Sequence, residues 1–194
     1  MQLANQFAFK EWAVICAALE QGRQTLILRK GGIDEGREGF RVEHGEFWLF
    51  PTSFHQQPDE LIPEAWPLLE QARTDADPRC VRLSLYAVVQ EVYHVQDLAT
   101  LSRLSGRHIW SDKTVEQRFY YRSPGLFALV VRVYRRESPI EIENSPHMAG
   151  CKSWVDLPSP LPSDKLRPVL VDATWERQCR DIATVLTNER RERT

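Results

Sequence analysis

Residues 22–56 read GRQTLILRKGGIDEGREGFRVEHGEFWLFPTSFHQ, and the rest of the chain is organised around them. The stretch holds two apolar runs, LIL and FWLF, and each of them ends in polar, turn-forming residues. Two buried strands that end in this way place cations, a hydroxyl and an imidazole at one end of a sheet, which is how ligand clefts are commonly built. The candidate ligand-binding residues are Arg29, Lys30, Gly31 and Gly32 after the first run, and Thr52 and His55 after the second.

Composition narrows the class of protein. The chain has 194 residues, which fits one large domain or one domain with appendages, and its hydrophobic fraction of 42% is enough for a sizeable core. The net charge of −2 provides no global positive field, so any polyanion site has to come from a local patch. The four cysteines are scattered without a Cys-x-x-Cys pair, and this pattern fits core packing better than a zinc site.

The amino terminus and the hydropathy indicate where the protein is found. There is no basic leader, and no apolar stretch approaches the length that spans a membrane. We therefore expect a cytoplasmic protein with reduced thiols and no membrane partner. We also expect neither a bound metal nor a cofactor. The oligomeric state is left open.

The first predicted element covers residues 7–21, FAFKEWAVICAALEQ. These residues include many helix formers and end at Gly22, which is typical of a helix and its C-terminal glycine. Apolar side chains cover more than one stripe, so we expect a largely buried helix. Lys10 and Glu11 interrupt the apolar run. Either both face solvent in the first turn, or one of them reaches the cleft.

Strand and cap signals predict the remaining elements. Runs of β-branched and aromatic residues indicate strands, and proline is accepted at a sheet edge. Asp97 and Ser111 are typical N-caps, each opening a short helix. The other predicted elements are a strand over 24–29, a tight hairpin at His44-Gly45, an interrupted helix around 60–72, strands over 80–95 and 126–134, and a short edge strand over 139–142.

The C-terminal part differs from the body in composition. The proline-rich segment 156–168, DLPSPLPSDKLRP, predicts an extended surface connection. An amphipathic helix follows over 173–189, and its apolar face packs either on the body or on a partner. We expect one domain over 1–155, a connection over 156–172, and a helix with its tail over 173–194. The order of elements favours an α+β domain around a strongly curved, largely antiparallel sheet.

Several segments resemble a known bacterial family, the "domain of unknown function 1802" family. They are KEWAV, GRQTLILRKGGI, VEH, FWLFPT and HQ, followed by HIWSD, RF and LVVRVYR. The similarity covers roughly residues 7–155, and its more specific part is LRKGGI together with FWLFPT and HQ. The family name implies no mechanism.

A more distant resemblance implies more. A helix followed by GRQTLILR over 22–29 is similar to the opening of the PUA-like/ASCH superfamily, whose pattern is G-x-K-x-x-E-x-R. That superfamily implies a curved, largely antiparallel β pseudo-barrel with flanking helices, here with an appended C-terminal helix. It also implies binding of RNA or modified bases. Gly22 and Arg29 match the pattern, but the motif lysine is Gln24 and the motif acid is Ile27. The loss of both argues against the amidohydrolase chemistry of the hydrolytic members.

A second cluster of cations and aromatics follows Ser111. Residues 118–122, RFYYR, combine the groups that stack bases and neutralise phosphates, so Arg118 and Tyr121 are candidate ligand-binding residues. The alternative is a helix end whose aromatics pack inward. Likewise Arg29 to Gly32 either form an anion-binding concavity or are a solvated strand end with a glycine turn.

The patterns typical of common enzymes are absent or poor. The chain has no Walker loop, no G-x-S-x-G and no Glu-x-Lys. His44, His55 and Glu43 match no metal spacing, and a structural role suits the histidines better. We therefore predict a binding module for RNA, a modified base or a nucleotide, rather than an enzyme. The alternatives are a small hydrolase acting on a nucleotide or nucleic acid, with His55 as acid–base, and a protein–protein adaptor that uses the C-terminal helix.

Overall fold

The longest feature of the fold is an antiparallel pair of strands. The computed structural model describes residues 1–30, 42–53, 56–148, 150 and 152–187. Strand β4 (Cys80–Val95) pairs with β5 (Leu126–Glu143) from Cys80 opposite Glu143 to Val95 opposite Leu126. The predicted strand over 80–95 is confirmed. Residues 139–142, predicted to be a separate edge strand, instead continue β5 and pair with the start of β4.

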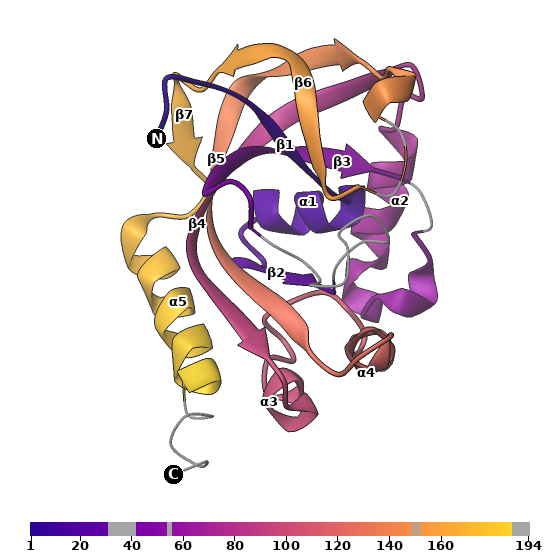
Figure 1. Cartoon of the computed structure of the whole chain (residues 1–194), viewed down its shortest axis with the longest axis vertical. Coiled ribbons are helices and arrows are strands. Elements are labelled where there is room, and N and C mark those ends of the chain that lie inside the picture. Colours follow the sequence, from indigo (N-terminus) through magenta and orange to yellow (C-terminus); the bar gives the residue numbers. More distant parts are fainter. Residues whose placement is uncertain (31–41, 54–55, 149, 151, 188–194) are drawn as a thin grey trace.

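The strands of the described residues form one open, mixed sheet of seven (Figure 1). Their order is β2, β5, β4, β3, β1, β6, and β7 pairs with β5 beside this path. All pairs are antiparallel except β1 with β3. The α+β class with a largely antiparallel sheet is therefore confirmed. The other strands are β1 (Ala4–Trp12), β2 (Leu26–Arg29), β3 (Glu46–Thr52), β6 (Trp154–Pro162) and β7 (Leu166–Pro168).

Three further predictions at the level of elements are wrong. Residues 7–12 belong to strand β1 rather than to a helix, because pairing with β3 and β6 overrides the helix propensity of the segment. The tight hairpin at His44-Gly45 does not form, since β3 pairs with β1 and β4, and residues 42–45 belong to no strand. The proline-rich segment 156–168 is extended, but it lies within β6 and β7 of the sheet rather than forming a surface connection.

The helices surround the concave part of the sheet. Figure 1 shows α1 (Ala13–Glu20) at the centre, with α2 (Trp66–Thr74) on one side and α5 (Asp172–Thr187) on the other. Helices α3 (Leu98–Ser102) and α4 (Asp112–Tyr120) follow β4. Both predicted caps are confirmed: the Asp97 carboxylate accepts the Thr100 N–H at 2.8 Å, and the Ser111 hydroxyl accepts the Thr114 N–H at 3.3 Å. None of the helices in the described residues is long and apolar enough to cross a bilayer.

Apolar side chains are buried on both faces of the sheet. Strand alternation sends Phe47 and Leu49 into the larger core, which also takes the buried face of α1. Trp48 and Phe50 point the opposite way, into a smaller core on the other face that is closed by β6 and Met148. Because both faces of the sheet are covered, the sequences of the buried strands are continuous apolar runs.

Helix α5 packs on its own chain. Ile182 and Leu186 are buried in the larger core, and the Gln178 amide donates to the Gly22 carbonyl at 3.2 Å. The predicted amphipathic helix is confirmed, and its apolar face is covered by the body. The adaptor alternative requires this apolar face to be exposed for a partner protein, and Ile182 and Leu186 are not exposed.

His108 is buried beside this core as a neutral ring. Only 4% of it is exposed, and neither ring nitrogen has a hydrogen-bond partner in the part of the chain that the structure describes. Burial lowers the pKa of His108 to about 4, whereas an unfolded histidine titrates near pH 6.5. The unfolded chain therefore binds more protons between these two values. Stability that is present above pH 6.5 is lost as the pH falls toward 4.

The first prediction tests this linkage. Between pH 7 and pH 4.5, we expect the natural chain to lose about 2 kcal/mol more unfolding free energy than a His108→Leu variant, measured by urea denaturation. His147→Gln is the matched control, because His147 is exposed. An equal loss in the natural chain and in His108→Leu would contradict the burial of a neutral ring.

Candidate functional site

The parallel strands β1 and β3 end side by side. Trp12 lies opposite Thr52 in the register, and the Thr52 hydroxyl donates to the Glu11 carbonyl at 3.2 Å. Glu11 is buried, with 3% of its surface exposed. One of its carboxylate oxygens accepts the backbone N–H of Trp12 at 2.8 Å. Thr52 thus holds the end of β1 in place. A buried carboxylate lies at this end of the sheet.

Arg29 reaches this carboxylate from the opposite edge of the sheet. Its guanidinium donates to the Ser153 hydroxyl at 2.6 Å, and another terminal nitrogen lies 3.6 Å from a Glu11 oxygen. The guanidinium also lies 4.7 Å from the centre of the Phe9 ring. Arg29 ends β2, whereas Glu11 is in β1 and Ser153 precedes β6, so one side chain connects the two edges of the open sheet.

Arg118 approaches the same place from helix α4. Its guanidinium lies 3.8 Å from the centre of the Trp110 ring and 5.3 Å from the centre of the Trp12 ring. Burial lowers the pKa of Arg118; the negative charges of Glu11 and Glu60 oppose this change, and the positive charge of Arg29 adds to it. These four charges are therefore close enough to interact. We call Glu11, Arg29 and Arg118, with the rings of Trp12 and Trp110, the arginine cluster.

Lys30 has a different role from Arg29. Its ammonium donates to the backbone carbonyls of Phe119 at 2.9 Å, Gly125 at 2.7 Å and Ser123. These three bonds use all three donors of the group, and burial lowers the pKa of Lys30. Lys30 therefore fastens the segment after α4 to the end of β2, and it has no donor left for a ligand.

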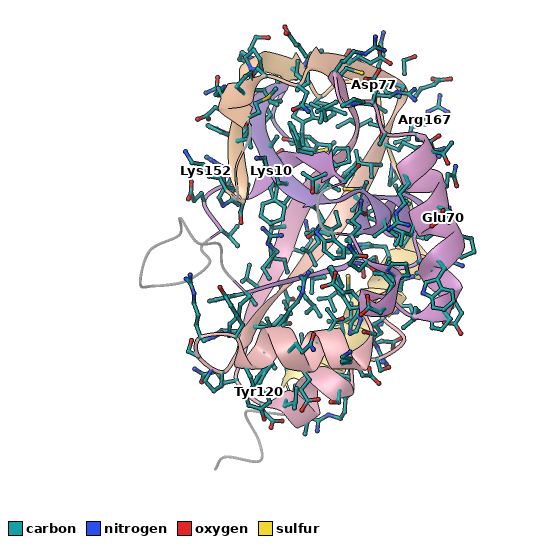
Figure 2. All side chains as sticks on the ribbon, turned by 90° about the vertical axis from the view of Figure 1, so that its right-hand side faces the viewer. Lys10, Glu70, Asp77, Tyr120, Lys152 and Arg167 are labelled. Atoms are coloured by element: carbon teal, nitrogen blue, oxygen red, sulfur yellow. The ribbon has the colours of Figure 1, made fainter. Side chains whose placement is uncertain are left out.

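The aromatic residues after Arg118 divide between core and surface. Phe119 is buried, whereas Tyr120 and Tyr121 are each more than half exposed, and Figure 2 shows Tyr120 at one end of the molecule. The Arg122 guanidinium lies 5.3 Å from the centre of the Tyr121 ring. Arg122 has a φ of 63°, in the left-handed region that a non-glycine residue rarely adopts. Phe119 thus packs inward, as the alternative interpretation expects, whereas ligand binding by the exposed end of the segment stays a prediction.

The structure brings together only part of the predicted site. Arg29, Arg118 and Thr52 gather around the end of β1, Lys30 supports them, and Tyr121 lies beyond α4. Gly31, Gly32 and His55 lie outside the described residues. His44 stacks on Phe7 with ring centres 3.6 Å apart, which is a structural role.

Sequence reasoning did not name all members of the cluster. The sequence indicates Glu11 only as a charge that faces solvent or reaches the predicted cleft; the structure shows that it does not face solvent, because it is buried beside Arg29. Trp12, Trp110 and Ser153 were not named as site residues. The signal for Glu11 was its place inside a buried apolar run, where a charge needs a partner. The changed motif positions are structural: the Gln24 amide accepts the Ile109 N–H at 3.2 Å, and Ile27 is buried.

Comparisons with known proteins give a family and a set of similar structures. The sequence profile of the family described as "Domain of unknown function (DUF1802)" matches residues 8–181. Similar solved structures are ASCH from Zymomonas mobilis, at 15% identity over 78% of this chain and 86% of that chain with a TM-score of 0.45, and a mutant of that protein, at 14% identity over 81% and 91% with a TM-score of 0.46. ASCH is the superfamily that residues 22–29 resemble. No curated protein matches the sequence.

The second prediction concerns the link across the sheet. We expect Glu11→Gln and Arg29→Met each to lower the unfolding free energy by about 1–3 kcal/mol, because each leaves a buried partner without its counter-charge. The double variant should lose about 1 kcal/mol less than the two single losses combined. Urea denaturation of all four chains measures this coupling. The exposed pair Arg82–Glu141, 3.4 Å apart, is the control, and its coupling should stay below about 0.5 kcal/mol. Equal coupling in the two pairs would contradict a special role for Arg29.

The third prediction concerns Lys30. Lys30→Met leaves three carbonyls without their donor, so we expect a loss of about 1–3 kcal/mol in unfolding free energy. Faster amide hydrogen exchange over residues 119–125 should accompany it, since this segment is what Lys30 fastens. Lys113→Met, on the exposed face of α4, should change neither quantity. Unchanged exchange in Lys30→Met would show that the segment is held by other contacts.

Proposed function

The chain belongs to the DUF1802 family, and we propose that it is a binding module for a nucleotide unit, taken from RNA, as a free nucleotide or as a modified base, at the arginine cluster. The observation that supports this most is the stack of Arg118 on Trp110, 3.8 Å from ring centre to guanidinium. None of the described residues forms a hydrogen bond with the Arg118 guanidinium, so its planar edge remains available for a phosphate or a base.

The surroundings of Arg118 supply the other contacts that a nucleotide needs. The buried carboxylate of Glu11 holds the Arg29 guanidinium, and the charge of Arg29 is felt at Arg118. Tyr120 and Tyr121 expose their rings at the end of the same helix that carries Arg118, with Arg122 against Tyr121. Exposed rings next to arginines form a surface on which bases stack. The resemblance to the ASCH pattern implies the same class of ligand.

The charge balance of the site favours a ligand that presents a base and few phosphate groups. Glu11 and Glu60 offset Arg29 and Arg118, and the ammonium of Lys30 is fully bonded to carbonyls. Few phosphates can then be neutralised, so binding should depend weakly on salt.

A cytoplasmic location is part of the proposal, because the described cysteines Cys16, Cys80 and Cys179 are free thiols.

The fourth prediction tests the arginine stack. In fluorescence anisotropy with labelled single-stranded RNA of mixed sequence, we expect Arg118→Ala to weaken binding at least about tenfold, in line with about 1–3 kcal/mol per stacked contact. Arg118→Lys keeps the charge but loses the planar stack, so it should weaken binding nearly as much. Arg177→Ala on the exposed face of α5 is the control and should bind like the natural chain.

The ligand and the salt dependence are measured in the same assay. Competition by free nucleotides and modified nucleosides distinguishes a single unit from a strand. The slope of log K against log salt should be on the order of −1, since each neutralised phosphate contributes about −0.7 for single strands. Absence of binding to RNA, single-stranded DNA and nucleotides at low salt would reject the proposal, as would full affinity in Arg118→Ala.

A further inference from the structure

A small cavity lies between helix α5 and the body, away from the arginine cluster. Its walls come from α1, from the two residues before β2, from β5 and from residues 169–175. Apolar side chains, including Leu19, Val133 and Leu170, form most of the lining. The cavity has room for about one water-sized group.

Three polar side chains in this lining have buried atoms with no hydrogen-bond partner. They are the Thr25 hydroxyl, the Nε of Arg132 and the Nε1 of Trp175. Thr25 is 97% buried, since only 3% of it is exposed. A buried donor without a partner is costly, and three around one cavity point to a common acceptor between them.

The chemistry of these three groups favours an acceptor that carries negative charge. Two of them, Arg132 Nε and Trp175 Nε1, are N–H donors that cannot accept, and the Thr25 hydroxyl can turn to donate. The Gln24 amide adds no acceptor, because its oxygen already receives the Ile109 N–H and its nitrogen donates to the Leu26 carbonyl. A water molecule here would find donors in excess. An anion can accept from all three groups.

The local electrostatics also favour an anion. Arg132 lines the cavity; the Asp172 carboxylate bonds its Nη2 and leaves its buried Nε without a partner among the described residues. Trp175 lies in the first turn of α5, a helix of 16 residues whose amino-terminal end carries partial positive charge. The Arg132 guanidinium lies 4.8 Å from the centre of the Trp175 ring, so cation and indole are already held together.

We propose that this cavity binds a monatomic anion of the size of chloride, held by Thr25 Oγ1, Arg132 Nε and Trp175 Nε1. The anion links the first turn of α5 to strand β5 and to Thr25, the residue before β2. Anion binding therefore stabilises the docked position of the C-terminal helix. This site does not depend on the proposed nucleotide function.

The fifth prediction is a chloride dependence of stability in the full chain. At equal ionic strength, the melting temperature should be higher by about 2–4 °C in sodium chloride than in sodium gluconate, whose anion is too large for the cavity. Sodium bromide should act like chloride. The chloride-dependent rise should disappear in Arg132→Lys, which keeps the charge but lacks the Nε–H, and in Trp175→Phe, which lacks the indole N–H.

The control variant is Trp66→Phe, because Trp66 is exposed and lies outside the cavity, and it should keep the full rise. Crystals of the natural chain grown in bromide should show an anomalous peak within hydrogen-bond distance of all three atoms. This measurement does not depend on whether a variant folds. Coincident melting curves in chloride and gluconate, a full rise in both variants, or a water without anomalous signal at that position would each overturn the proposal.

Discussion

A single arginine connects the two edges of the open sheet. Arg29 ends β2 at one edge and bonds Ser153 and Glu11 at the other, where β1 and β6 lie. Lys30, the next residue, bonds three carbonyls of the segment after α4. The end of β2 therefore fixes both the buried carboxylate of Glu11 and the helix that carries Arg118.

Local signals in the sequence were sufficient for much of the fold. The β-branched run of β4 and the caps Asp97 and Ser111 depend on neighbouring residues, and all three were predicted correctly. The helix formers within β1 are a local signal, and they predict a helix. The strand partners of β1 lie some 40 and 150 positions away, where a local signal cannot indicate them. Strand β6 was read as a connection because of its prolines, which an edge strand accepts.

In the candidate site, too, local sequence signals do not reveal which distant groups each side chain contacts. Arg29 and Lys30 were predicted together as an anion clamp, since both are cations at a strand end. The fold separates them: Lys30 uses all its donors on carbonyls, and Arg29 faces a carboxylate and a hydroxyl. Among the described residues of the candidate site, Arg118 forms no hydrogen bond through its guanidinium, which stacks on Trp110. Sequence reveals which residues carry charge, but only the tertiary contacts decide which charge remains available.

The pairing of β1 with β6 has a consequence for synthesis on the ribosome. Ala4 and Asn5 pair with Pro162 and Leu161, so β1 waits for a strand that is synthesised much later. At about 5–20 residues per second, this delay is roughly 8–30 s. During that time the nascent chain carries an unpaired strand edge, which is the kind of surface that invites aggregation. A chaperone that covers residues 4–12 during translation would therefore raise the yield of folded protein.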